Sequence, residues 1–130
     1  MRRFATILGC AALAVLWCWN PIEAQLDKLK NTKPEERAKI QTELMDHQLG
    51  LTADQKPKIA AINLEYAKKA QPVLESGRPF AEMRELKELD QQKDAALKPV
   101  LTPDQYTKYA AGKEELRQKL DERLMQKATP

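Results

Sequence analysis

The order of apolar and polar residues along the chain predicts helices almost throughout. From residue 33 onward, apolar positions recur every three or four residues, which is the spacing of one face of an α-helix. Proline and glycine divide this stretch at Gly50, at residues 76–79 and at residues 98–99. We find no stretch with the alternating pattern of a strand. The pattern therefore predicts an all-α fold with four helices, over about residues 33–49, 53–75, 80–97 and 103–127.

The first predicted helix is bounded by residues that commonly begin and end helices. Thr32 and Glu35 have the T-x-x-E spacing of a capping box, in which each side chain bonds a backbone N–H of the other residue. Gly50 follows the last apolar position, where a residue in the left-handed conformation often ends a helix. We therefore expect Thr32 to cap a helix that runs from Lys33 to Leu49.

One short polar word occurs twice, as LTADQK from Leu51 and as LTPDQY from Leu101. In each copy the threonine hydroxyl is placed to accept a hydrogen bond from the backbone N–H of the glutamine, and the glutamine side chain is placed to return it. The leucine before each threonine is positioned to pack against the new helix. Both words therefore predict helix starts rather than catalytic devices, and their capping residues are Leu51, Thr52, Gln55, Leu101, Thr102 and Gln105.

Large apolar side chains are few for four helices of this length, and the segment 80–97 has the least regular set. A closed four-helix bundle needs an apolar face of about three positions in seven on every helix. Two antiparallel helical hairpins that form an open cradle, with a second subunit closing it, fit this composition better. We therefore expect a homodimer.

The first residues have the layout of a secretory signal peptide. Arg2 and Arg3 precede an uncharged run over residues 4–19, and a small residue, Ala24, ends the segment. We expect cleavage after Ala24, which leaves one all-α domain over residues 25–130. A transmembrane anchor is the alternative, but a span needs about 20 apolar residues; lipidation at Cys10 is a second alternative.

The remaining composition excludes several classes of site. Both cysteines, Cys10 and Cys18, lie inside the predicted signal, so the exported chain has no disulfide or thiolate ligand. The formal net charge is only +3, without the clustered basic excess of a nucleic-acid-binding protein. His47 is the single histidine, and a zinc site needs several such ligands. We therefore expect no catalytic, metal or cofactor site.

Acidic residues are plentiful in the segment 80–97, but basic residues alternate with them. A carboxylate pair tuned for acid–base chemistry needs a pocket that removes one member from water. Because arginine and lysine lie among these acids, we interpret them as a solvated helix face. They are Glu82, Glu85, Glu88, Asp90 and Asp94.

The second predicted helix carries basic residues beside its apolar face. Lys58 and Lys69 are eleven residues apart and therefore share one helix face near Ile62. Arg78 extends this basic run. A basic and apolar face of this kind is suited to acidic, partly unfolded polypeptide. The alternative is that these residues only keep the surface soluble.

The two L-T-x-x-Q words, each at the start of a helix behind a signal peptide, give the chain a resemblance to a known family. It resembles the LTxxQ-motif proteins, the Spy/CpxP family of the bacterial periplasm, over about residues 32–123. This resemblance implies an all-α, cradle-shaped dimer in the periplasm, acting as an ATP-independent chaperone or as a regulator of envelope stress. Some members bind metal; this chain differs from those members in having a single histidine.

These observations lead to one hypothesis and two alternatives. The first is a periplasmic, ATP-independent chaperone that binds exposed apolar segments of unfolded envelope proteins. The second is a regulatory partner of the periplasmic domain of a sensor kinase, and the third is a metal-buffering protein. No cofactor is expected, nor is an enzymatic activity.

Overall fold

The structure, a computed structural model, describes residues 27–128, and regular structure in this part of the chain is helical throughout. This confirms the prediction of an all-α fold. The predicted signal peptide, residues 1–24, lies outside the described residues. A short helical stretch over residues 27–31 precedes five helices, which are α2 (Pro34–Leu49), α3 (Gln55–Leu74), α4 (Pro79–Leu97), α5 (Pro103–Ala111) and α6 (Lys113–Ala128).

The helix α2 ends as predicted but begins differently. Gly50 follows it in the left-handed conformation, with φ 63° and ψ 59°. At its start, Lys33 occupies the capping position without a side-chain bond, and Pro34 opens the first turn. The expected capping box at Thr32 is wrong, because the Thr32 hydroxyl donates to the Lys28 carbonyl at 2.8 Å and belongs to the preceding helical stretch.

The turn between α3 and α4 follows the residues that break helices. Gly77 has a left-handed φ of 68°, and Pro79 opens α4. The buried Glu82 carboxylate accepts a hydrogen bond from the Arg78 backbone N–H at 3.0 Å, and another from the Ser76 hydroxyl at 3.2 Å. This carboxylate therefore holds the turn against the first turn of α4.

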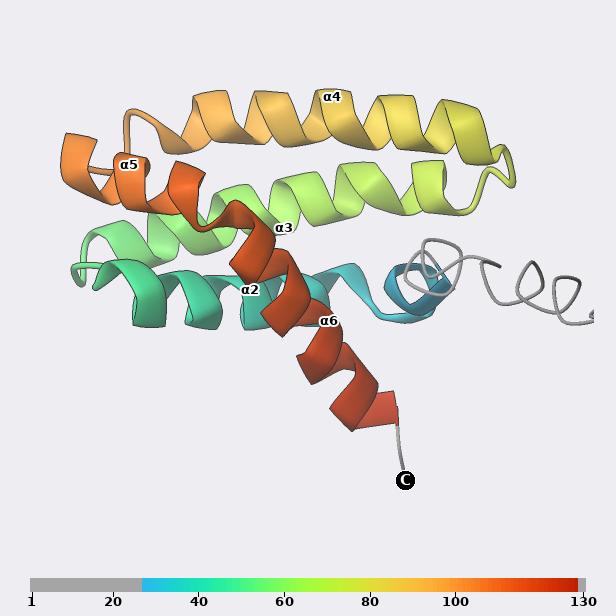
Figure 1. Ribbon diagram of the computed structural model, residues 1–130, viewed down its shortest axis with the longest axis horizontal. Coiled ribbons are helices and arrows are strands. Elements are labelled where there is room, and N and C mark those ends of the chain that lie inside the picture. Colours follow the sequence, from blue (N-terminus) through green and yellow to red (C-terminus); the bar gives the residue numbers. More distant parts are fainter. Residues whose placement is uncertain (1–26, 129–130) are drawn as a thin grey trace, which may run out of the picture.

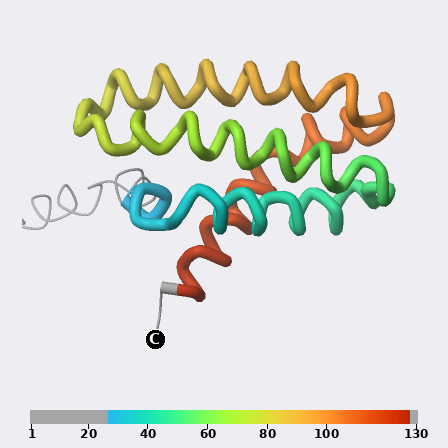
Figure 2. Tube along the Cα trace, turned by 180° about the vertical axis from the view of Figure 1, so that it is seen from behind, coloured from blue at the N-terminus to red at the C-terminus, as the bar shows by residue number. Residues whose placement is uncertain are grey.

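Three helices form a layer that the other two cross. The helices α2, α3 and α4 lie side by side and run in alternating directions, with α3 in the middle (Figures 1 and 2). The pair α5 and α6 crosses one face of this layer diagonally, and α6 packs on α2 (Figure 1). As a result, the two ends of α4 differ: its last turns lie near α5, whereas α6 diverges from its first turns.

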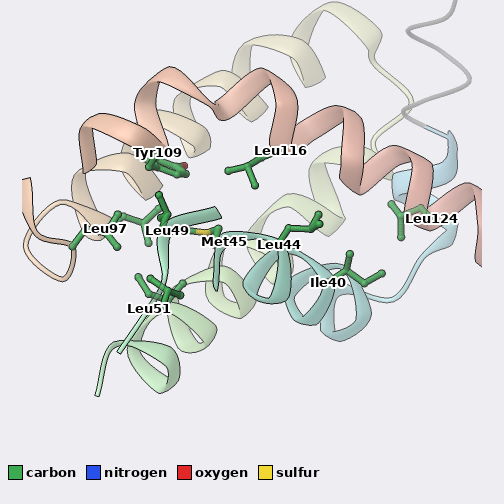
Figure 3. Packing of buried hydrophobic residues seen from close by; sticks show 11 residues of the cluster. Ile40, Leu44, Met45, Leu49, Leu51, Leu97, Tyr109, Leu116 and Leu124 are labelled. Carbon is green, nitrogen blue, oxygen red and sulfur yellow. The ribbon is translucent and has the colours of Figure 1, made fainter. Parts of the chain in front are cut away.

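The core lies where the layer meets α5 and α6 (Figure 3). The helix α2 contributes most to it, and Met45 and Ile59 are completely buried. Leu97 is the one residue of α4 in this cluster. Its buried members are Ile40, Leu44, Met45, Leu49, Leu51, Ile59, Leu97, Leu101, Tyr109, Leu116 and Leu124.

The last predicted helix is two helices rather than one. Gly112 separates α5 from α6, although the helical bond pattern continues from Gly112 N–H to the Lys108 carbonyl at 2.9 Å. A Cβ atom at Gly112 would lie 1.9 Å from the Gln48 side-chain nitrogen, so the absence of a side chain lets α5 approach α2. The expectation of one uninterrupted helix is therefore wrong at this residue.

Arg37 is a buried charge that joins the first described residues to the layer. Its guanidinium donates to the backbone carbonyls of Leu29, Thr32 and Ala67, and to the Gln71 side-chain oxygen at 2.8 Å. Burial lowers the pKa of Arg37, while nearby Glu35 acts in the opposite direction. Carbonyl dipoles therefore take the place of water around this cation.

Candidate functional site

Both repeated words form the capping boxes that the sequence predicts. In the first, Gln55 N–H donates to the Thr52 hydroxyl at 3.2 Å, and Thr52 N–H donates to the Gln55 side-chain oxygen at 3.0 Å. The second repeats the two bonds at the same distances between Thr102 and Gln105. Pro103 opens the first turn of α5, where its missing N–H costs no hydrogen bond.

The first capping box begins slightly before α3 itself. The Thr52 carbonyl accepts a bond from Lys56 N–H at 3.1 Å, which is the four-residue spacing of an α-helix. The leucines that precede the two threonines, Leu51 and Leu101, are 7% and 5% exposed and belong to the core cluster. Each word therefore anchors a turn in the core and starts a helix.

The glutamine side chains of the two words also form hydrogen bonds with each other, a contact that was not predicted from the sequence. Gln55 Nε2 donates to Gln105 Oε1 at 2.7 Å, and Gln105 Nε2 donates to Gln55 Oε1 at 3.0 Å. Gln55 Nε2 also donates to the Val100 carbonyl at 3.1 Å, while Gln105 Nε2 donates to the Gly50 carbonyl at 3.5 Å. We call this pair of side chains, Gln55 and Gln105, the glutamine clasp.

The symmetry of the glutamine clasp explains why the word occurs twice. Val100 precedes Leu101 and Gly50 precedes Leu51, so each glutamine bonds the same backbone position in the opposite turn; Gln105 Nε2 also donates to the Leu49 carbonyl at 3.4 Å. The only sequence signal for this contact was the identical position of glutamine in both words. The repetition is therefore a contact between two turns as well as two local caps.

A polar cluster joins α4 to α5 and α6. Lys113 Nζ lies 2.6 Å from Asp90 Oδ2 and 2.7 Å from Asp94 Oδ2. Arg117 pairs with Asp90 at 3.0 Å, and the Tyr109 hydroxyl donates to Asp94 Oδ1 at 2.8 Å. We call these five residues the α4 junction. The interpretation of Asp90 and Asp94 as part of a solvated face is therefore wrong.

The signal for the α4 junction was the matching spacing of its charges. Asp90 and Asp94 are one helical turn apart, as are Lys113 and Arg117, so two facing helices can align the two pairs. Burial raises the pKa of the Tyr109 hydroxyl, and so does its bond to Asp94. Burial acts to lower the pKa of Lys113, but its bonds to Asp90 and Asp94 outweigh this effect and raise it.

Lys93 lies buried near this cluster without joining it. The side chain is 6% exposed, and within residues 27–128 its ammonium group has no hydrogen bond or ion pair. Burial lowers the pKa of Lys93 to about 7, although Asp90 and Asp94 act to raise it. Burial therefore favours the neutral amine over the ammonium form more than in an exposed lysine.

A perturbed lysine beside two carboxylates is a combination that enzymes use, but this cluster has no room for a substrate. The hollow beside it, lined in part by Gln41, Tyr109 and Leu116, measures about 30 Å³. That volume is enough for about one water molecule. The geometry of the α4 junction is therefore that of a polar contact between helices.

A larger groove lies between α2 and α3. Its volume is about 360 Å³, and Ala38, Ala60 and Leu64 give it an apolar floor. Charged side chains form its rim, where Lys56 pairs with Asp46 at 3.0 Å. The remaining lining residues are Glu35, Lys39, Thr42 and Glu43. We call this feature the α2–α3 groove; no pattern in the sequence indicates it.

A buried amide lies behind this groove. Asn63 is completely buried, and its Nδ2 donates to the hydroxyl of Thr42, one of the groove residues, at 2.9 Å. The Asn63 side-chain oxygen has no hydrogen-bond partner within the described residues. The bond from Asn63 to Thr42 joins α3 to α2, since a buried amide nitrogen costs free energy in any arrangement that leaves it unbonded.

The four residues predicted to bind polypeptide do not gather at one place. Lys58 is exposed, whereas Ile62 is partly buried against the core cluster. Lys69 pairs with Glu65 at 2.7 Å and lies over the Tyr66 ring. Arg78 lies outside α3, in the turn before α4. None of the four lines the α2–α3 groove, and polypeptide binding through them stays a prediction.

Two large apolar side chains on α4 are exposed. Phe80 is 91% and Met83 is 49% exposed. Met83 belongs to the irregular apolar set of the segment 80–97, and its exposure could not be predicted from the sequence. The reason is the arrangement of the helices, since nothing in the sequence indicates that α6 diverges from the first half of α4.

Two further findings concern metals and membranes. His47 lies exposed on α2, and no three His, Cys, Asp or Glu side chains within residues 27–128 gather closely enough to hold a metal ion. Over the same residues, none of the helices combines the length and the apolar character that a membrane span requires.

Comparison with protein families gives one match. The sequence model described as a domain of unknown function (DUF4890) matches residues 24–109, which reach from the predicted cleavage site into α5. No curated protein and no solved structure matches the chain.

Proposed function

The chain belongs to the family described as a domain of unknown function (DUF4890), and on this premise we propose that it is an ATP-independent, chaperone-like protein of the periplasm. It binds apolar segments of unfolded envelope proteins and keeps them from aggregating. The resemblance of its two L-T-x-x-Q words to the Spy/CpxP family supports this proposal. A cleaved signal peptide over residues 1–24 and a cradle-shaped homodimer of two helical hairpins are parts of the same proposal.

The observation that carries the proposal is the α2–α3 groove. A floor of alanine and leucine offers apolar contact to a polypeptide, and the small alanine side chains leave room for it. The rim is charged, and most of its charges are paired: Lys56 with Asp46 inside the rim, and Glu35 and Glu43 with Lys68 and Arg123 outside it. Such a surface holds apolar segments with little dependence on their exact sequence, which suits a protein with many clients.

The α4 junction supports binding rather than catalysis. Its acidic and basic groups bond to each other, and the hollow beside them is too small for a metabolite. The α2–α3 groove, in turn, has no buried pair of titratable groups on its floor. We therefore propose that this protein acts by binding other molecules at its surface rather than by catalysis.

The test is suppression of client aggregation by a variant with a blocked groove. In Ala60→Arg a long side chain stands in the floor of the α2–α3 groove, and we expect it to weaken suppression of light scattering by a denatured client at least several-fold. Ala61→Arg is the matched control, since Ala61 is the next residue of α3, is exposed and lies outside the groove. We expect it to act like the unmodified protein.

The results distinguish the alternatives. Circular dichroism and thermal melting first verify that both variants are folded. If the unmodified protein leaves light scattering unchanged at equimolar concentration, the chaperone proposal is wrong. Recovery of one defined sensor-kinase domain from envelope extracts, instead of many unfolded proteins, would support the regulatory alternative. Equal effects of Ala60→Arg and Ala61→Arg would show that the groove is not the binding surface.

A further inference from the structure

The first half of α4 has an exposed face of mixed apolar and basic character. The helix lies along one edge of the layer, next to α3 (Figures 1 and 2). Phe80 and Met83 are its exposed apolar residues. Arg84 and Lys87 are also exposed and follow Phe80 by four and seven residues, which places all four on one helix face. We call Phe80, Met83, Arg84 and Lys87 the α4 stripe.

The basic residues of the α4 stripe form no ion pair, whereas most acids of the same helix are engaged elsewhere. Within the described residues, neither Arg84 nor Lys87 makes an ion pair or a hydrogen bond. Asp90 and Asp94 bond to the cations of the α4 junction. The remaining acids are Glu82, which is buried against the preceding turn, Glu85, which lies 3.8 Å from Arg78, and the exposed Glu88.

The position of Glu88 leaves the charge of the α4 stripe positive. It lies about a quarter turn further round the helix than the centre of the stripe, since each residue advances by about 100°. The outward face of this half-helix therefore presents two cations beside two apolar side chains, with one acid, Glu88, at its edge, one helical turn from Arg84 and not paired with it within the described residues.

The shape of this surface indicates the class of partner. Binding sites for small molecules and peptides are concave. Phe80 and Met83 line neither the α2–α3 groove nor the hollow at the α4 junction, and Phe80 projects almost fully into solvent. A projecting apolar side chain can insert among the acyl chains of a lipid layer, which rearrange around it.

An amphipathic helix face with aromatic and basic residues is typical of proteins that lie in the membrane interface. Anionic headgroups attract lysine and arginine near the surface. From this charge complementarity and the projecting shape, we propose that the α4 stripe docks the protein on an anionic lipid surface. Phe80 and Met83 enter the boundary between headgroups and acyl chains, while Arg84 and Lys87 contact lipid phosphates.

The proposed contact is small and therefore reversible. Two apolar side chains and two charges give weak attachment, much like a single lipid chain without a second anchor. The α4 stripe shares no residue with the α2–α3 groove, so lipid binding does not depend on the proposed chaperone function. A protein docked in this way keeps the groove available to polypeptide.

Flotation with lipid vesicles tests the proposal. The protein, purified in the form that cells process it to, is mixed with vesicles of phosphatidylcholine alone or with added phosphatidylglycerol. We expect the protein to float with the anionic vesicles at low salt and to be released by added salt, because salt screens exposed charges. Phe80→Ser with Met83→Ser, and separately Arg84→Glu with Lys87→Glu, should each lower the bound fraction about tenfold.

A matched control separates the stripe from net charge. Lys33→Glu with Lys108→Glu changes the net charge as much as the second stripe variant does. Lys33 and Lys108 are exposed, make no ion pair within the described residues and lie outside α4. We expect this control to float like the unmodified protein. All variants share the same N-terminus, so the residues before the described part of the chain affect every comparison equally.

Several results would overturn the proposal. They are absence of flotation, equal flotation with neutral vesicles, or no effect of either stripe variant. If the Lys33 and Lys108 control loses as much binding as Arg84→Glu with Lys87→Glu, net charge rather than the stripe is responsible. Loss of client binding by the stripe variants, with vesicle binding intact, would assign the α4 stripe to polypeptide instead. Circular dichroism verifies folding, and the charge variant remains informative if the serine variant does not fold.

Discussion

Gln55 and Gln105 each serve two purposes with one side-chain amide. The oxygen of each accepts a bond from the threonine N–H of its own turn and another from the opposite glutamine. The nitrogen of each donates to the opposite glutamine and to a carbonyl of the opposite turn. An amide group offers two donors and two acceptor sites, and the glutamine clasp uses all of them.

The glutamine clasp predicts that two glutamine substitutions are not additive. Gln55→Ala and Gln105→Ala should each lower the free energy of unfolding by about 2 kcal/mol, because each leaves partner groups unbonded. The double variant should cost about 1 kcal/mol less than the sum of the two. Urea denaturation of the four proteins measures this difference.

Substitution of the two capping threonines is the control for this comparison of single and double variants. Thr52→Ala and Thr102→Ala should each cost about 1 kcal/mol, as lost caps do. Their effects should add to within about 0.5 kcal/mol, since the two hydroxyls bond only within their own turns. Strict additivity of the glutamine pair as well would show that the clasp contributes no coupling.

The lowered pKa of Lys93 predicts that the stability of the fold depends on pH. The pKa of its ammonium group is about 7 in the folded chain, below the ordinary value of 10.5 that we expect on unfolding. Between these two values the unfolded chain binds one more proton, so stability rises with pH by about 1.4 kcal/mol per unit from this group. Below pH 7 Lys93 is charged in the folded chain as well, so the full free-energy cost of burying this charge lowers the stability of the fold.

Substitution of this lysine should remove the effect. Lys93→Met should be more stable than the unmodified protein at pH 7, and the difference should shrink as the pH rises toward 10. Thermal melting across this range measures it. Lys87→Met is the control, because Lys87 lies on the same helix but is exposed. Parallel curves for the unmodified protein and Lys93→Met would contradict the prediction.

At the scale of elements, α4 differs from the other helices. The inner side of α2 is almost entirely apolar, whereas the buried residues of α4 are Glu82, Lys93 and one large apolar residue, Leu97. Its last half is held by Leu97 and the α4 junction, and its first half mainly by α3. The irregular apolar pattern of this segment thus reflects a helix at the edge of the fold.

Hydrogen exchange should therefore vary along α4. We expect backbone amides in residues 83–88 to exchange faster than those in residues 93–97, because the first half has fewer buried contacts to break on opening. Amides in the middle of α2, around Met45, should be among the slowest. Exchange followed by mass spectrometry measures these rates. Uniform protection along α4 would contradict this description of the helix.

At the scale of the whole molecule, the fold has one covered and one uncovered face. The pair α5 and α6 covers one face of the layer, and no helix among the described residues covers the other (Figure 2). A chain with few large apolar residues gains stability by sharing a surface with a second copy. This supports the proposed homodimer.

Light scattering on the purified protein tests the dimer. We expect a mass twice that of the processed chain, and a melting temperature that rises with protein concentration, because association stabilises the folded state. A denaturation midpoint independent of concentration, together with a monomer mass, would contradict it.

The sequence by itself determined the helices and their boundaries. Local hydrogen bonds and restricted backbone angles decide these features, so Gly50, Pro79 and the capping residues Thr52 and Thr102 could be read from single turns of the chain. The same reasoning failed at Thr32, where a neighbouring helical stretch offered its hydroxyl another acceptor. It also failed at Gly112, which separates α5 from α6 where the chain lies against Gln48 of α2.

Only the tertiary structure decided which distant residues meet. The glutamine clasp joins residues fifty positions apart, and the α4 junction joins two helices by charges that looked solvated in the sequence. The α2–α3 groove and the exposed α4 stripe likewise depend on how the helices pack against one another. Helix periodicity specifies which side of a helix is apolar, but the crossing of helices determines which polar groups are bonded to each other and which apolar ones remain in contact with water.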